Sequence, residues 1–248
     1  MSEIPNRAKT FIVVVMLIAA VVTVYAVGTR FSAENGKFLL LLALAVIAAR
    51  LKLTLPGFDS SMSMNLPFML LAISELPLAQ AIAVGAFSTF AQTMSRSGQT
   101  VKPVQAVFNV CNMVNAIAIA SVASGRAMHL EGLNKPFLIS AAALAFFIAD
   151  TVPVAAVISM TSPTRGLEVW SEIALMTFPY FVLSAGVACV VATGFEAVGW
   201  KAGLATMAVM LLVYRSFRFY FQNMKASASV AKPVASVSIA MHKAAGAD

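Results

Sequence analysis

The chain has 248 residues, of which 60% are hydrophobic and only 11% are charged, and its mean hydropathy is +0.88. A soluble domain of this length needs a much more highly charged exterior, so the composition excludes an ordinary soluble protein. The net charge of +7 does not indicate nucleic-acid binding, because the basic residues lie in short segments beside apolar runs, as in inner-membrane proteins. We therefore predict an all-α, polytopic transmembrane helix bundle.

Apolar runs predict about eight helical segments, separated by polar residues, Pro and Gly. The first run follows Arg7 and Lys9 and is too long for the core of a cleaved signal peptide, so we expect an uncleaved membrane anchor. Pro153 is expected to break or kink the sixth segment. The expected segments cover approximately residues 10–27, 37–53, 65–74, 78–94, 104–124, 136–160, 171–193 and 198–218.

The third of these segments, residues 65–74, is too short to cross a membrane alone. It follows a polar stretch over residues 54–65 that contains Pro and Gly, which predicts irregular or extended backbone. If the third segment re-enters the membrane, or joins the fourth in one broken span, the bundle has between about six and eight membrane segments. We place the integral membrane domain at residues 1–222 and expect a flexible polar tail over residues 223–248.

The distribution of basic residues predicts the orientation of the bundle. With the N-terminus in the cytoplasm, 12 of the 17 Lys and Arg residues fall on the inner side and 5 on the outer side, as the positive-inside rule requires. We therefore expect a multi-pass protein of the bacterial cytoplasmic (inner) membrane with both termini in the cytoplasm. The inner group is Arg7, Lys9, Arg50, Lys52, Arg96, Lys102, Arg165, Arg215, Arg218, Lys225, Lys232 and Lys243, and the outer group is Arg30, Lys37, Arg126, Lys135 and Lys201.

Polar residues at the predicted membrane depth are the candidates for a functional site, because such groups are costly against lipid. Gln105, Asn109 and Asn112 fall within about 60° of one another on the fifth helix, and Asn115 lies beside them. The three asparagines of this stripe are therefore expected to face the bundle interior. Asp150 lies near the middle of the sixth helix, and we predict that Asn109 and Asn112 face it. The candidate ligand-binding residues are Asp150, Asn109, Asn112, Asn115, Gln92 and Gln105.

Two interpretations of these polar residues stay open. Asn, Gln and Ser commonly join transmembrane helices by hydrogen bonds, so the stripe, with Ser88 and Thr89 of the fourth segment, could be purely structural. Asp150 likewise either holds neighbouring helices together or serves a ligand or proton in a wet cavity. Glu75 and Glu196 lie in outer turns, where solvated loop charges are the simplest interpretation.

No catalytic or metal-binding constellation is found in the sequence. Cys111 and Cys189 lie inside apolar runs and are expected to be buried free thiols. His129 and His242 are far apart along the chain. A nucleophile–base pair, a paired-carboxylate motif and a phosphate-binding loop are all missing. We therefore predict no enzyme activity, no metal and no cofactor.

Several stretches carry a resemblance to a known family. Residues 103–116 read Pro-Val-Gln-Ala-Val-Phe-Asn-Val-Cys-Asn-Met-Val-Asn-Ala, residues 150–155 read Asp-Thr-Val-Pro-Val-Ala, and residues 215–220 read Arg-Ser-Phe-Arg-Phe-Tyr. With residues 53–73 and 168–184, they resemble the multi-helix membrane input domain found ahead of HD-GYP and GGDEF modules in bacterial cyclic-di-GMP signalling proteins. The resemblance covers roughly residues 38–224 and implies a membrane sensor.

The chain departs from that family in two places. It ends at Asp248, so we expect no catalytic output module of its own, and Asp150 stands where the family pattern has an asparagine. The Leu-Pro-Gly loop at residues 55–57, followed by a polar helix start, is also similar to substrate-binding subunits of energy-coupling-factor vitamin transporters.

These observations support three functions of different classes. The first is a membrane sensor or ligand-binding module for an unknown small ligand, which signals through a partner such as a cytoplasmic signalling enzyme or another membrane subunit. The second is a small-solute transporter or its substrate-binding subunit. The third is a structural or assembly factor without a ligand. In each case the surrounding partner is membrane lipid, and nucleic acid is not expected.

Overall fold

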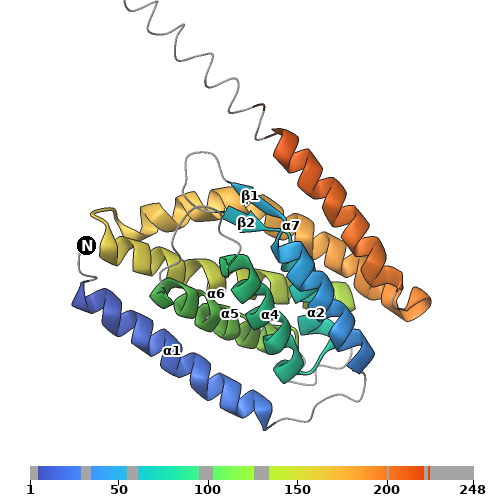
Figure 1. Ribbon diagram of the computed structural model, residues 1–248, viewed down its shortest axis with the longest axis horizontal. Helices are drawn as coiled ribbons and strands as arrows, with labels where there is room; N and C mark the ends of the chain where they lie inside the picture. The colour runs from blue at the N-terminus through green and yellow to red at the C-terminus, as the bar shows by residue number, and fades with distance from the viewer. Residues whose placement is uncertain are drawn as a thin grey trace, which may run out of the picture.

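The computed structural model describes residues 5–28, 35–54, 61–94, 103–125, 134–199, 201–220 and 223. Apart from Asn223, the tail predicted over residues 223–248 lies outside the described residues. The described residues form helices α1–α7 and a further C-terminal helix. Together they make a bundle with α1 along one edge (Figure 1). The helices are α1 (Asn6–Val27), α2 (Asn35–Ala49), α3 (Leu66–Glu75), α4 (Leu78–Met94), α5 (Pro103–Ala123), α6 (Lys135–Thr161), α7 (Gly166–Val198) and the C-terminal helix (Lys201–Tyr220).

Five of these helices are long and apolar enough to cross a membrane: Asn6–Val27, Pro103–Ala123, Lys135–Thr161, Gly166–Gly194 and Lys201–Tyr220. The eight predicted helical segments are therefore present in the described part of the chain, whereas eight spans stay a prediction. With its 15 residues, α2 rises only about 22 Å, less than the roughly 30 Å of a hydrocarbon core. The shortest helix, α3, has 10 residues.

Two short paired strands lie in the stretch between α2 and α3 for which irregular or extended backbone was predicted, while residues 55–60 of that stretch lie outside the described residues. Strand β1 (Lys52–Thr54) pairs antiparallel with β2 (Ser61–Ser63) in the register Lys52↔Ser63. The backbone N–H of Met64 donates to the carbonyl of Leu51 at 3.2 Å, which extends the ladder toward the ends of both flanking helices. The pairing of β1 with β2 therefore satisfies backbone groups on strands that adjoin the buried helix α3.

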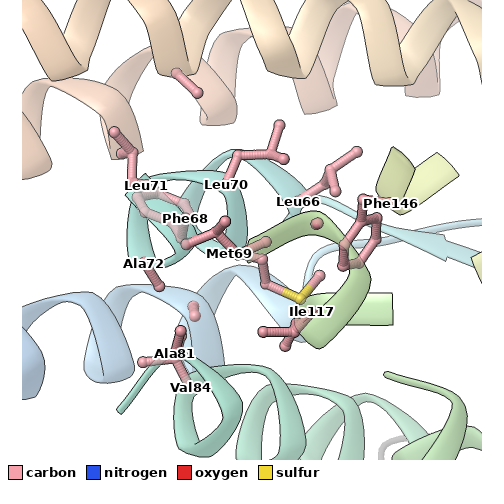
Figure 2. Packing of buried hydrophobic residues seen from close by; sticks show 14 of the residues in the cluster. Leu66, Phe68, Met69, Leu70, Leu71, Ala72, Ala81, Val84, Ile117 and Phe146 are labelled. Carbon is pink, nitrogen blue, oxygen red and sulfur yellow. The ribbon is translucent and has the colours of Figure 1, made fainter. Parts of the chain in front are cut away.

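The short helix α3 forms the centre of the bundle. All residues from Leu66 to Ile73 are buried, and the helix packs against α2, α4, α5, α6 and α7. A helix that is apolar on every side needs such an enclosed position, because it has no face suited to water. Figure 2 shows this packing. Side chains of α4, α5 and α6 (Ala81, Val84, Ile117 and Phe146) lie around those of α3 (Leu66, Phe68, Met69, Leu70, Leu71 and Ala72).

Helices α4 and α5 approach each other closely at Gly85. A Cβ atom at this position would overlap Cδ1 of Ile117 and would lie 3.2 Å from Cγ of Met113. The absence of a side chain at Gly85 therefore permits the close packing of α4 against α5.

Helix α6 continues from Lys135 to Thr161 through Pro153, so the predicted break is wrong, whereas the alternative of a kink stays a prediction. A proline removes a single N–H donor, and the hydrogen bonds of the turns on either side can maintain the helix, as is common in transmembrane segments.

Large apolar side chains cover much of the outside of the bundle. On α1, Val21 and Val24 are 70% and 75% exposed, and on α7 Leu175 is 82% exposed. An exterior of this kind would be unfavourable in water and is compatible with a multi-pass membrane protein.

Candidate ligand-binding site

The central feature of the candidate site is an amide–carboxyl pair that joins α5 to α6. The Nδ2 atom of Asn112 donates hydrogen bonds to the Oδ1 atom of Asp150 and to the backbone carbonyl of the same residue, both at 3.0 Å. Asn112 is only 2% exposed, whereas Asp150 is half-buried. The prediction that Asn112 faces Asp150 is therefore confirmed.

The rest of the α5 stripe does not converge on this pair. Asn115 turns toward α1 and donates from Nδ2 to the backbone carbonyl of Val15 at 3.1 Å, which is a helix-joining bond of the structural kind. Asn109 is half-buried and makes no side-chain hydrogen bond to any residue that the structure describes, so its predicted approach to Asp150 stays a prediction.

Gln105 is exposed, so it does not line the bundle interior beside Asn112. It lies in the first turn of α5, where Pro103 and Val104 are exposed as well, and the stripe becomes interior only further along the helix. Gln92 is half-buried near the end of α4.

Several buried polar oxygens of α4 and α5 have no hydrogen-bond partner among the described residues: Oδ1 of Asn112, Oδ1 of Asn115 and Oγ1 of Thr89. A buried acceptor without a donor is costly, and proteins usually satisfy it with water or a ligand. The Oδ2 atom of Asp150 also makes no hydrogen bond to a described residue. The α5–α6 pair is therefore only partly satisfied and could accept donors from a small molecule.

A second polar cluster lies at the start of α3, and the sequence did not predict it as a unit. Ser63 Oγ donates to Asn65 Oδ1 at 2.7 Å, and Asn65 Nδ2 donates to Ser88 Oγ at 3.3 Å. The Tyr180 hydroxyl of α7 donates to the Ser63 carbonyl at 2.8 Å and accepts from the backbone N–H of Leu66 at 3.4 Å. All of these residues are buried.

This second cluster, which we call the hairpin network (Ser63, Asn65, Ser88 and Tyr180), has a structural role. It ties β2 and the start of α3 to α4 and α7, and it gives a partner to a backbone N–H at a helix start, where no intrahelical acceptor exists. The polar run over residues 60–65 was the only sequence signal for it.

Glu75 at the end of α3 is not the solvated loop charge that was predicted. Its side chain is 11% exposed, and its carboxylate lies 2.8 Å from Lys135 Nζ and 3.9 Å from Lys37 Nζ. Lys135 also donates to the backbone carbonyl of Ala192 in α7 at 3.3 Å. These contacts join α2, α3, α6 and α7 at one end of the bundle, so the paired carboxylate can stay buried.

Groups that could bind a metal are sparse. Within the described ranges no three His, Cys, Asp or Glu side chains come together in a possible metal site. Cys111 and Cys189 are free thiols, as predicted, although both are half-buried rather than fully buried. His129 and His242 lie outside the described residues.

Comparison with protein-family models, with curated proteins and with solved structures finds no significant match for this chain. The resemblance to the input domain of cyclic-di-GMP signalling proteins therefore stays a prediction from the sequence.

Proposed function

We propose that the chain is a multi-pass membrane module that binds a small ligand or a proton at Asp150 and communicates its occupancy to a partner protein. The observation that carries this proposal is the amide–carboxyl pair: Asn112 holds one carboxyl oxygen, and the other oxygen has no described hydrogen-bond partner. No described Lys or Arg forms a salt bridge with Asp150. Placing an ionisable side chain in the hydrocarbon region without a cation partner costs free energy. Such a residue is therefore a candidate functional group.

Asn112 gives the proposed site its geometry. Because one Nδ2 atom bonds both the side chain and the backbone of Asp150, the carboxyl group is held against α5 in a fixed orientation. Fixed polar groups in an apolar surrounding are the usual basis of specificity in small-molecule sites. A ligand with a hydroxyl or amine donor would satisfy the open oxygens of Asp150 and Asn112.

A route from this site to α7 begins at the next residue. Thr151 is buried, donates to the carbonyl of Phe147 at 2.7 Å and accepts from Trp170 Nε1 at 3.1 Å. The rings of Phe147 and Phe181 also meet edge to face, with centroids 4.9 Å apart. A shift of α6 at Asp150 would therefore change the packing of α7, which is the kind of displacement that a partner can sense.

The proposed setting is the cytoplasmic membrane of a bacterium, with eight membrane segments and both termini in the cytoplasm. Support comes from the 12-to-5 distribution of basic residues. We expect opposite signals from topology reporters fused at Asp248 and within the segment 125–135. Equal signals from the two fusions would contradict the orientation.

Transport of a small solute is the second candidate function, and α3 favours it. A 10-residue helix in the bundle core, entered through an extended hairpin, is the discontinuous kind of element that lines substrate sites in transporters. Irregular backbone at membrane depth is tolerated where it is enclosed by protein or lines a cavity.

Purification of the tagged full-length protein with its partners distinguishes the two functions. We expect a stoichiometric complex with a cytoplasmic signalling enzyme, whose catalytic activity differs between the complex and the isolated enzyme. A stoichiometric pair of ATPase subunits would favour the transporter instead. Recovery of the protein alone, after mild detergent extraction and chemical cross-linking, would contradict signalling through a stable partner.

A further inference from the structure

A groove lies between the end of α2 and the C-terminal helix. Its volume is about 1000 Å³, and its apolar wall includes Leu51, Leu211, Leu212 and Phe219. Leu51 immediately follows α2 and the turn at Arg50, so the groove opens where one helix ends against the side of another. An apolar groove of this size on a membrane protein is unfavourable for water and favourable for a hydrocarbon chain.

The same groove carries a concentrated positive charge. Arg215 and Arg218 line it, and their spacing of three residues places them side by side on the C-terminal helix. Both side chains are exposed, and no acidic side chain is among the groove residues. Arg50 and Lys52 flank Leu51 in the sequence and add two further basic residues at this end of α2.

The C-terminal helix is held against the bundle by its other face. Ala202, Thr206 and Met210 are buried, and this spacing of four residues forms a single stripe along the helix. The arginines therefore belong to a packed helix whose position is fixed by the core.

We propose that this groove binds one anionic phospholipid, with the lipid phosphate between Arg215 and Arg218 and an acyl chain along the leucine wall. The planar guanidinium group forms paired hydrogen bonds with phosphate oxygens, and basic pockets between transmembrane helices are suited to anionic headgroups. Tyr214 at the same level can place its hydroxyl at the headgroup region and its ring in the apolar region. The site rests on the proposed insertion in a membrane and is separate from Asp150.

The test is a titration of the detergent-solubilised full-length protein with phosphatidylglycerol or with phosphatidylcholine of the same acyl chains, followed by native mass spectrometry. We expect one phosphatidylglycerol to bind preferentially. In the double variant Arg215→Gln/Arg218→Gln, its dissociation constant should rise roughly 30-fold, because each basic residue near a membrane surface contributes a several-fold gain in affinity. The matched control is Arg7→Gln/Lys9→Gln, which removes two exposed cations from α1 and should change the constant less than about threefold.

A second variant tests the groove independently of charge. Ala208 is exposed and lines the groove, so Ala208→Trp should fill it without disturbing the core and should also weaken phosphatidylglycerol binding by roughly tenfold or more. If the arginine variant and the α1 control lose the same affinity for phosphatidylglycerol, the lipid is attracted by the overall positive charge of the protein and the proposed site is wrong. Equal binding of the two lipids, or displacement by equimolar glycerol phosphate, would overturn it as well. If the protein is not inserted in a membrane, it should be recovered in solution without detergent, and this result is distinct from a loss of lipid binding.

Discussion

Replacing Phe68 by alanine is expected to lower the free energy of unfolding by about 3 kcal/mol. Phe68 is fully buried in α3 and lies among side chains from several helices (Figure 2). The expected loss is at the low end of the range for such truncations in soluble proteins. In a membrane, a displaced ring enters lipid rather than water, so the main terms are the cavity and the lost packing contacts.

The matched control for Phe68 is Phe87 on the neighbouring helix α4, which is 60% exposed. Phe87→Ala should change the unfolding free energy by no more than about 0.5 kcal/mol, because the ring is expected to face lipid. Both variants can be compared with the wild type by thermal or detergent-induced unfolding of the purified protein. Similar losses in the two variants would contradict the placement of α3 at the centre of the bundle.

Helix positions could be predicted from the sequence wherever an apolar run had clear ends. The fourth segment was predicted at residues 78–94 and is observed as Leu78–Met94, since Pro77 and the polar residues after Met94 mark its limits. The seventh was predicted at residues 171–193 but extends over Gly166–Val198. Hydropathy reports the part of a helix that suits lipid, whereas a helix can continue into flanking polar residues such as Glu168.

Contacts within the candidate site were predictable only in part. Helical periodicity placed Asn112 on an interior face, and the cost of an unpaired carboxyl pointed to Asp150 as its partner. The bond from Asn115 to Val15 and the bond from Tyr180 to Ser63 join residues 100 and 117 positions apart. Spacing along one helix contains no information about which distant helix lies beside it, so such bonds require the tertiary structure.

Asp150→Leu is expected to destabilise the bundle by about 1 kcal/mol, a typical value for one interhelical hydrogen bond in a membrane. The substitution removes the Oδ1 acceptor of Asn112, but the backbone carbonyl of residue 150 remains as a second acceptor. The loss should therefore fall short of the larger cost of a completely unpaired buried amide.

Asp150→Asn should leave the stability within about 0.5 kcal/mol of the wild type. The asparagine side chain is nearly isosteric with aspartate, and its Oδ1 atom can still accept from Asn112. It cannot ionise or exchange a proton with a ligand, so this variant separates the hydrogen bond from the acid–base property of the carboxyl group.

A working role for Asp150 is tested most directly by measuring, on the same preparations, thermal unfolding and the catalytic activity of the co-purified partner. The samples are the wild type, Asp150→Asn and Glu172→Gln, the last being the same chemical change at an exposed position of α7. We predict that Asp150→Asn has the same unfolding temperature as the wild type but no longer changes the catalytic activity of the partner. Glu172→Gln should match the wild type in both measurements. If Asp150→Asn retains full control of the partner, Asp150 only joins α6 to α5 and the proposed ligand or proton site is contradicted.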